Sequence, residues 1–233
     1  MRIQLADLVI DVDHKKDYTA QMCENYIYTG DRPADFSVKS TRETMLLEME
    51  KQPGFPLDFL ESLCLYRQIC DQILSYDALL LHAAAIAVDG EAYLFTAVSG
   101  TGKTTHINLW LEKFGDRAIV VNGDKPILRK IDGKFFVCGT PWSGKECLNT
   151  NTKVPIRGIC ILERAKENRI VRISPQDGLH TLLTQTVRPQ DVSKMDAMLK
   201  TLEDLMQSVP LYRLGCNMDP EAAEVSYRGM SMQ

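Results

Sequence analysis

The sequence lacks the cysteine patterns that staple small folds or hold structural zinc. Its seven cysteines are odd in number, and no two of them form a C-x-x-C pair. Disulfide frameworks use even sets of cysteines, and zinc knuckles use closely spaced pairs. The pattern therefore favours a reducing compartment, and we expect a cytoplasmic protein.

Long hydrophobic runs and an excess of positive charge are also missing. The most apolar stretch, residues 79–88, contains His82 and is too short to cross a bilayer, and residues 1–16 lack a signal-peptide core. The net charge of -4 does not suit a broad surface for a nucleic-acid backbone. We therefore expect neither membrane nor nucleic acid as a partner. The apolar fraction of 45% in 233 residues is enough for an ordinary buried core.

Two parts of the chain differ in pattern. Residues 1–76 read as a small α+β unit that could recruit a substrate, and residues 77–233 read as a catalytic domain. In the first part, Ile3 to Val12 is typical of a strand. A later segment places apolar residues at helical spacing and predicts one buried helical face, made of Phe59, Leu63, Tyr66, Cys70 and Ile73.

The second part alternates strand and helix signals, which predicts an α/β fold with a mixed sheet. Residues 79–88 and 91–98 read as two strands of a hairpin joined at Asp89-Gly90, and Asp132-Gly133 marks a second hairpin. A helix begins at Lys103 and ends at Gly115. Further strands are expected at 118–121, 154–162 and 169–173, an amphipathic helix over 192–209, an edge strand at 211–214 and a last short helix after Asp219-Pro220-Glu221.

A glycine-rich segment lies between a predicted strand and a predicted helix. Residues 97–104, Ala-Val-Ser-Gly-Thr-Gly-Lys-Thr, match the phosphate-binding P-loop pattern with Ala97 in place of its first glycine. Gly100 and Gly102 allow a turn whose N–H groups face an anion, and the following helix N-terminus adds its dipole. Lys103 would contact the outer phosphates of ATP, and the Thr104 hydroxyl would bind Mg²⁺. An ordinary glycine-rich turn is the alternative.

A phosphotransferase also needs a carboxylate near the transferred phosphate. Asp124 follows the predicted strand 118–121, so its side chain emerges at a strand end that would face the P-loop. Asn122 and Lys125 flank it and could help to hold metal or phosphate. Asn122-Gly123-Asp124 is also good turn chemistry by itself, so both interpretations stay open at this point.

Two further segments allow a structural and a functional interpretation. His82 lies in an apolar strand, where a histidine is more often a core residue, although this strand is expected beside the one that leads to the P-loop. Residues 139–145, Gly-Thr-Pro-Trp-Ser-Gly-Lys, suit a flap over a ligand. The alternative is a surface loop with Trp142 folded back.

These pieces together resemble the HPr kinase/phosphorylase family. The resemblance rests on Leu81-His82, the strand that follows, and the run Ser99 to Thr104; the Ser-Gly-Thr-Gly-Lys-Thr-Thr run ending at Thr105 is also similar to the loop of ATP-dependent phosphoenolpyruvate carboxykinases, which share that fold. The arrangement is most similar to compact HPr-kinase-like proteins associated with peptide-modification clusters. Those combine the histidine strand and this loop with a helix tryptophan, an Asn-x-Asp-Lys-Pro strand end and a Gly-Thr-Pro-Trp-Ser-Gly loop.

The resemblance implies a role for each matched residue. ATP phosphates would bind to Ser99, Gly100, Thr101, Gly102, Lys103, Thr104 and Thr105. Asp124 would be the general base and a metal ligand with Thr104, and His82 would lie beside it. The acceptor would be a serine of a small protein or peptide, with Mg²⁺ as cofactor, and an oligomer is possible because the HPr kinases form assemblies.

The chain also departs from the family. Gly123-Asp124 stands where HPr kinases have two adjacent aspartates, the downstream arginine-glycine signature has at most an echo in Arg157-Gly158, and residues 1–76 match no usual N-terminal domain. A kinase for a small molecule such as free serine, and a nucleotide-sensing or peptide-binding module without turnover, therefore remain alternatives. The sequence does not separate the three.

Overall fold

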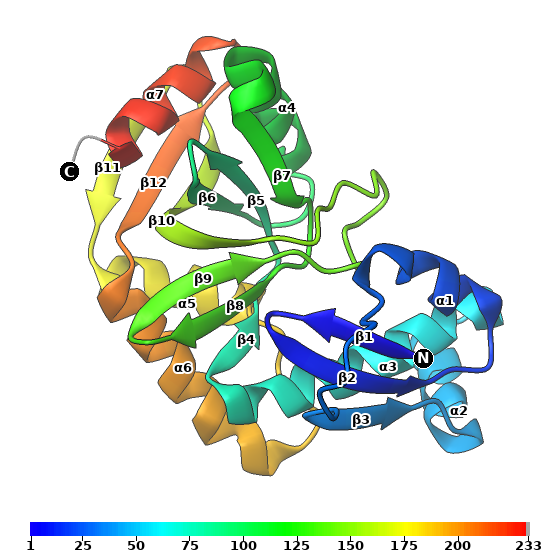
Figure 1. Cartoon of the computed structure of the whole chain (residues 1–233). Coiled ribbons are helices and arrows are strands. Elements are labelled where there is room, and N and C mark those ends of the chain that lie inside the picture. The colour runs from blue at the N-terminus through cyan, green and yellow to red at the C-terminus, as the bar shows by residue number, and fades with distance from the viewer. Residues whose placement is uncertain (232–233) are drawn as a thin grey trace.

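The computed structural model describes residues 1–231. Within that range no helix is both long and apolar enough to span a bilayer. The chain forms two sheets flanked by helices (Figure 1), and the larger one is a mixed sheet, which confirms the predicted α/β class.

The N-terminal unit is built on a three-stranded sheet. The expected strand from Ile3 to Val12 is in fact a hairpin of β1 (Arg2–Leu5) and β2 (Leu8–Asp13), because Ala6 and Asp7 have positive φ angles that turn the chain. β3 (Phe36–Lys39) pairs with β2 in parallel. Three helices complete the unit, and the bounds are α1 (Asp17–Met22), α2 (Arg42–Lys51) and α3 (Leu57–Ile73).

Nine strands form the larger sheet. Its central path runs β4 (Ala78–Leu80), β8 (Ile127–Ile131), β9 (Lys134–Cys138), β10 (Lys153–Arg164), β6 (Glu91–Thr96), β5 (Ala83–Val88) and β7 (Ala118–Asn122). β12 (Leu211–Cys216) pairs with β10, and β11 (Arg169–Ile173) pairs with β12. The twelve-residue strand β10 therefore joins the antiparallel β8–β9 hairpin at its start to parallel partners at its end.

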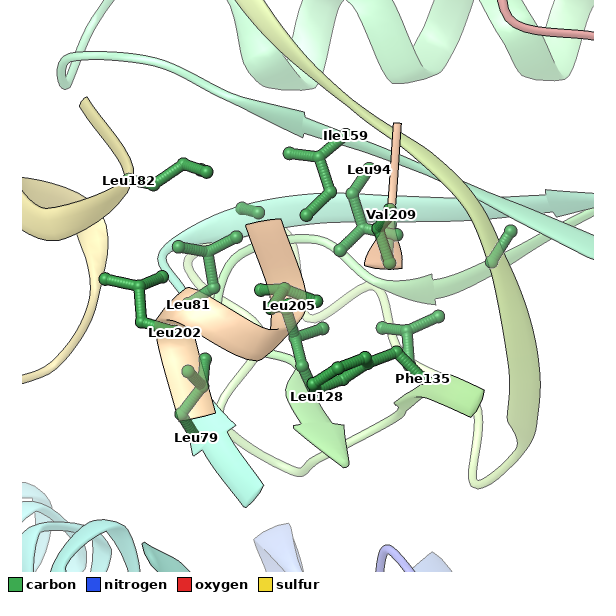
Figure 2. Close-up of a cluster of buried hydrophobic side chains, with 14 of the residues drawn as sticks. Leu79, Leu81, Leu94, Leu128, Phe135, Ile159, Leu182, Leu202, Leu205 and Val209 are labelled. Carbon is green, nitrogen blue, oxygen red and sulfur yellow. The ribbon is translucent and has the colours of Figure 1, made fainter. Parts of the chain in front are cut away.

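Helices cover both faces of the region around β5 and β6. α4 (Lys103–Phe114) and α7 (Glu221–Ser231) pack on one face, and α5 (Pro175–Gln185) and α6 (Met195–Ser208) pack on the other. The two faces take alternate residues of β5, because Ala83, Ala85 and Ala87 join the core shown in Figure 2, whereas Ala84, Ile86 and Val88 face α4. A strand buried on both faces reads as one apolar run, which is why it was recognisable in the sequence.

Two predicted strands differ from the structure. Residues 79–88 are not one strand, because the chain leaves β4 at Leu81-His82 and enters β5 in another part of the sheet. The strand expected at an edge near residues 211–214 is interior, since β12 lies between β10 and β11. Side-chain pattern alone could not distinguish these positions, because they depend on pairings between distant segments.

The strand order places the ends of β6 and β7 together. β5 is antiparallel to both β6 and β7, so β6 and β7 run in the same direction and end at the same edge of the sheet. The P-loop follows β6 and Asp124 follows β7. The predicted convergence of these two segments is therefore a consequence of sheet topology.

Candidate functional site

The P-loop has the backbone conformation that its glycines were expected to provide. Gly100 and Gly102 have φ angles of +79° and +124°, which side chains other than glycine rarely adopt, and the space beside each Cα is open. Gly102 is the N-cap of α4, so the helix begins at Lys103 as predicted. The loop thus presents a helix N-terminus to an open space, which is suited to an anion.

Lys103 lies at the mouth of this loop. Its Nζ donates to the Ala97 carbonyl oxygen at 3.4 Å, a long contact that leaves the ammonium group able to exchange partners. Burial lowers the pKa of Lys103, and the negative charge of Asp124 partly opposes that effect. Thr104 follows on the same wall, whereas Thr101 uses its hydroxyl to bond the Val98 carbonyl oxygen at 2.7 Å.

Arg164 holds the P-loop from outside and was not anticipated from the sequence. This residue ends β10, and its guanidinium donates to the carbonyl oxygens of Gly100 at 2.6 Å and Thr101 at 3.3 Å. These bonds satisfy two loop carbonyls and tie the P-loop to the end of β10. The only available signal was a charged residue at the end of an apolar strand, which is common and therefore not specific.

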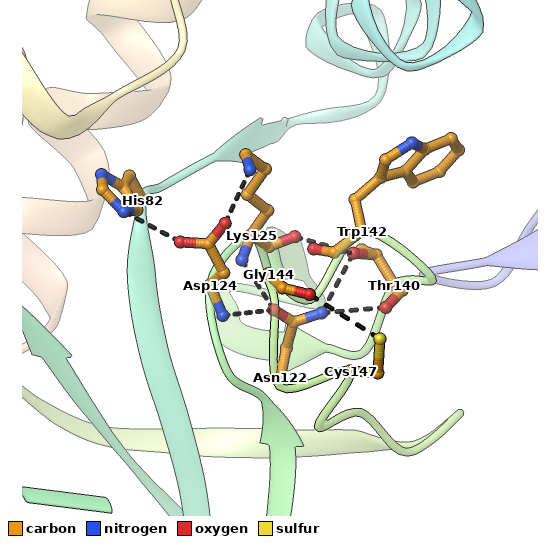
Figure 3. A network of polar contacts seen from close by, with 8 residues as sticks. All are labelled: His82, Asn122, Asp124, Lys125, Thr140, Trp142, Gly144 and Cys147. Carbon is orange, nitrogen blue, oxygen red and sulfur yellow. Dashed lines mark hydrogen bonds and ion pairs between the residues drawn. The ribbon is translucent and has the colours of Figure 1, made fainter. Parts of the chain in front are cut away.

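Asp124 and His82 lie together, as Figure 3 shows. The Nε2 atom of His82 is 2.9 Å from Oδ1 of Asp124, and Nζ of Lys125 donates to Oδ2 at 2.6 Å. The main chain is fixed as well, because the Ala83 N–H donates to the Asp124 carbonyl oxygen at 3.0 Å. Because the chain breaks between β4 and β5, His82 lies at the end of β7 beside Asp124. The sequence had left a core position and a position near the P-loop as alternatives for this histidine.

The environment of Asp124 keeps its carboxylate ionised. Burial alone raises the pKa of Asp124, but the hydrogen bonds from His82 and Lys125 and the positive charge of Lys125 outweigh it and bring the pKa down to about 2. Each carboxylate oxygen carries two lone pairs, so both can accept a further hydrogen bond. The Asp124 carboxylate can therefore accept a hydrogen bond from a further hydroxyl group while it keeps its bonds to His82 and Lys125.

Asn122 builds the turn that carries Asp124. Its Oδ1 accepts from the backbone N–H groups of Asp124 at 2.9 Å and Lys125 at 2.6 Å. Its Nδ2 donates to the carbonyl oxygen and the hydroxyl of Thr140, and the Thr140 hydroxyl donates to the Lys125 carbonyl oxygen at 2.8 Å. Turn chemistry and a functional carboxylate are thus not alternatives here, because the turn is what positions the carboxylate.

The glycine at position 123 has a structural cause. A Cβ atom built there would lie 3.2 Å from the Ser143 carbonyl oxygen and 3.4 Å from that of Leu148. The N–H of Gly123 also donates to the Leu148 carbonyl oxygen at 2.8 Å. The loop 139–149 therefore packs closely against position 123, and a side chain there would require its carbonyl oxygens to shift by a few tenths of an ångström.

Trp142 is folded back rather than standing over the site. The ring is 7% exposed and lies against Tyr66 of α3, with the ring centroids 5.2 Å apart. Residues 145–147 at the tip of the same loop are exposed, and Gly144 approaches the side chain of Asp124. The structure thus favours the second interpretation for Trp142 itself, while the loop still forms one wall of the site.

A cavity of about 860 Å³ joins these groups. Its walls include Ser99, Gly100, Gly102, Lys103 and Thr104 from the P-loop segment, and His82, Gly123, Asp124 and Lys125 from the strand ends. Residues 141–148 supply a third side and α1 and α3 a fourth. Of the residues predicted to bind the nucleotide, Thr101 and Thr105 are not among the cavity-lining residues found within the described range, 1–231. This volume is in the range of small-molecule and cofactor sites.

Among the described residues there is no group of three or more His, Cys, Asp or Glu side chains that could hold a metal ion. A magnesium ion on a nucleotide needs fewer protein ligands, because it keeps waters and binds phosphate oxygens. Thr104 and Asp124 line the cavity with suitable oxygen atoms, and the same lining includes the Glu146 carboxylate and the hydroxyls of Ser62, Ser99 and Ser143.

Comparison with known proteins identifies no family. No family model matches the chain, and no curated protein matches it. One solved structure to which it is similar is the Hpr(Ser) kinase/phosphatase from Coxiella burnetii. The sequence identity is 11% and the TM-score 0.38, over 64% of this chain and 95% of that chain. These low values leave the chemistry to be inferred from the side chains of the site.

Proposed function

We propose that the chain is an ATP-dependent phosphotransferase that moves the γ-phosphoryl group of ATP to a serine hydroxyl of a small protein or peptide. The observation that carries the proposal is one cavity in which a P-loop with its lysine and a hydrogen-bonded Asp124–His82 pair face each other. Each part occurs in proteins with other functions. Their meeting across one cavity is what phosphoryl transfer requires.

The triphosphate would bind to the P-loop residues Ser99 to Thr104. The backbone amides at the start of α4 and the ammonium group of Lys103 would balance its charge. Thr104 and Asp124 would hold Mg²⁺, which when bound neutralises charge on the phosphate oxygens. The lowered pKa of Lys103 reflects a partly desolvated cation, and a triphosphate would provide the partner that stabilises it.

In the reaction, the acceptor oxygen would form a bond to the γ-phosphorus while the bond from that phosphorus to the ADP oxygen breaks. The acceptor hydroxyl would donate its hydrogen bond to Asp124 and pass its proton to that carboxylate, which later releases it to water. A carboxylate with a pKa of about 2 is a weak base. The proton would therefore move late, when the bond to phosphorus has made the hydroxyl acidic.

His82 would orient Asp124 through its bond to Oδ1. Lys125 lies within reach of both Asp124 and the cavity, and would add positive charge beside the transferred group. Most of the rate acceleration in such a site comes from position and charge, not from covalent chemistry. The serine acceptor is proposed from the resemblance of the sequence to HPr-kinase-like proteins.

Two substitutions separate nucleotide binding from transfer. Lys103→Ala removes the charge on the phosphates, so we expect MgATP affinity to fall at least tenfold in isothermal titration calorimetry. Asp124→Asn keeps the shape of the site and one oxygen that can still contact Mg²⁺, while the phosphates and Thr104 hold the ion, so we expect MgATP affinity within threefold of wild type. Because the basic carboxylate is lost, transfer should fall at least a hundredfold, measured as labelled phosphate on a serine-peptide pool. Lys113→Ala, which removes a surface ion pair with Glu224 at the other end of α4, is the control for helix damage.

Equal transfer rates for Asp124→Asn and wild type would remove Asp124 from the mechanism. Absence of MgATP binding by the wild-type protein would refute the whole proposal. Phosphorylation of free serine but of no peptide would assign the small-molecule alternative, and binding without any ADP release would assign the sensing module.

A further inference from the structure

One wall of the cavity is aromatic and comes from the N-terminal unit. Tyr18 and Met22 of α1 and Phe55, Phe59 and Leu63 in and before α3 line it. Phe55 and Phe59 stack with centroids 5.2 Å apart, and Tyr18 meets Phe59 edge-on at 6.5 Å. Phe55 is 49% exposed and Tyr18 40% exposed, so the wall offers apolar surface that the fold itself leaves uncovered.

The exposure follows from how α3 packs. Residues such as Leu60, Leu65 and Ile69 fill the core of the N-terminal unit, and Tyr66 packs on Trp142. Phe59 and Leu63 belong to the apolar stripe that was predicted to be buried, yet they are only partly buried and face the cavity. The stripe is therefore longer than the core requires. Its surplus residues border the polar groups of the candidate site, as apolar residues do in many ligand sites.

The position of the wall indicates which reactant it contacts. Loop 141–148 lies against Asp124 through Gly144 and against α3 through Trp142, so this loop connects the carboxylate to the helix that carries Phe59 and Leu63. In Figure 1 the loop projects between α4 and the N-terminal unit. The attacking and leaving oxygens in phosphoryl transfer lie in line on opposite sides of the phosphorus. With ADP on the P-loop, the acceptor would enter on the side of Asp124 and loop 141–148, and the helix that carries the aromatic wall packs on that loop.

We propose that Tyr18, Phe55 and Phe59 bind an apolar side chain next to the acceptor hydroxyl, so that the enzyme selects polypeptide segments in which the serine has an apolar or aromatic neighbour. This inference rests on the proposed phosphotransfer. Free serine carries no apolar group to cover the wall, whereas a peptide brings one at a fixed distance from its hydroxyl. The wall thus acts as a specificity determinant of the same site.

The test compares two synthetic heptapeptides that differ only beside a central serine. One has phenylalanine on both sides of the serine and the other has aspartate. Transfer from MgATP is measured by mass spectrometry, and binding of each peptide is measured by calorimetry with the protein saturated by Mg²⁺ and a non-transferable ATP analogue. We expect at least a tenfold preference for the phenylalanine peptide in both measurements.

Variants assign that preference to the wall. Phe55→Ala and Phe59→Ala should each reduce the preference about tenfold and leave the affinity for MgATP within twofold. Leu57→Ala is the matched control, because Leu57 is 48% exposed at the start of the same helix and is not among the cavity-wall residues found within 1–231. Phe55 and Tyr18 are exposed enough that substituting either one leaves the core intact, and melting temperatures verify this.

The outcomes separate the wall from the kinase. Equal use of the two peptides, or neither peptide binding a protein that binds MgATP, overturns the wall proposal. An effect of Leu57→Ala as large as that of Phe55→Ala overturns it too. If Phe59→Ala weakens the binding of ATP but not the binding of inorganic tripolyphosphate, the wall contacts the nucleobase and the proposal is wrong. If the phenylalanine peptide binds at the wall but receives no phosphate, the phosphotransferase proposal fails and the recognition by the wall stands.

Discussion

His106 is a buried histidine that belongs to the support of the P-loop and not to its chemistry. His106 lies in the first turn of α4 and is 2% exposed. Its backbone N–H donates to the Gly102 carbonyl oxygen at 2.9 Å. The indole Nε1 of Trp110 donates to the Ser226 hydroxyl at 2.9 Å and lies 3.1 Å from Nε2 of His106, which is also 3.1 Å from that hydroxyl. Burial lowers the pKa of His106 to about 4.

This predicts acid sensitivity with a defined sign. An unfolded histidine has a pKa of about 6.5, so between pH 6.5 and 4 the unfolded state binds more protons than the folded state. His106 makes its full contribution to the free energy of unfolding above pH 6.5. That free energy falls by about 3 kcal/mol as the pH drops toward 4. Urea denaturation at pH 7, 5.5 and 4.5 measures it.

The comparison is made with variants. His106→Gln should flatten the dependence in this interval, whatever its effect on stability at pH 7. His180→Gln, on the exposed face of α5, is the matched control for the histidine-to-glutamine change. An unaltered slope in His106→Gln would show that another group titrates.

At the scale of elements, the turn after β7 is held by side chains more than by its own backbone. Asn122 is fully buried and serves two backbone donors and both oxygens of Thr140. These bonds connect the end of β7 to the loop that follows β9. The carboxylate of Asp124 depends on this connection for its position.

Asn122→Ala should therefore lower the free energy of unfolding by about 3 kcal/mol, because buried hydrogen-bonding groups lose their partners. It should also reduce transfer more than MgATP affinity, since Asp124 loses its anchor. Asn151→Ala, which removes one exposed bond to the Asn25 carbonyl oxygen, is the control. A loss for Asn122→Ala no greater than for this control would show that the turn forms without its asparagine.

How far the sequence predicts these elements depends on the range of the contacts involved. The helix that begins at Lys103 and is capped by Gly115 and the hairpin turns at Asp89 and Asp132 follow from local rules, and the structure confirms them. Phosphate binding by the P-loop remains a prediction. The break at His82 and the interior position of β12 depend on pairings with residues far along the chain. Arg164 contributes through contacts of the same kind, so no local pattern marked it. Thr140 belongs to the segment 139–145 that the sequence singled out, but its bonds to Asn122 could not be predicted from that segment.

At the scale of the whole molecule, Glu61 of α3 ties the N-terminal unit together. Its buried carboxylate accepts from the backbone N–H groups of Lys15 at 2.7 Å and Lys16 at 3.0 Å, and from the hydroxyls of Thr19 and Ser40. These donors come from the segments around α1 and before α2. One side chain thus fixes α1 against α3, the two helices that supply the aromatic wall. The boundary near residue 76 and a recruiting role for the unit remain predictions.

Glu61→Gln should destabilise the protein by about 2–3 kcal/mol, because an amide NH₂ group would face donors and not acceptors. We expect it to impair transfer to the phenylalanine peptide while MgATP affinity stays within threefold, since the P-loop belongs to the other part of the chain. Thermal melting and calorimetry measure the two effects, with Glu50→Gln on the exposed side of α2 as control. A parallel loss of MgATP affinity would indicate that both parts unfold as one.

The crowding around Gly123 also limits which descendants of this sequence are reachable. A Cβ atom at this position would lie 3.2 Å from the Ser143 carbonyl oxygen and 3.4 Å from that of Leu148, closer than most side chains approach a carbonyl. Aspartate at position 123 would therefore require the neighbouring loop to shift slightly before it could stand beside Asp124. We expect a substitution at position 123 to be tolerated best together with a change in residues 143–148.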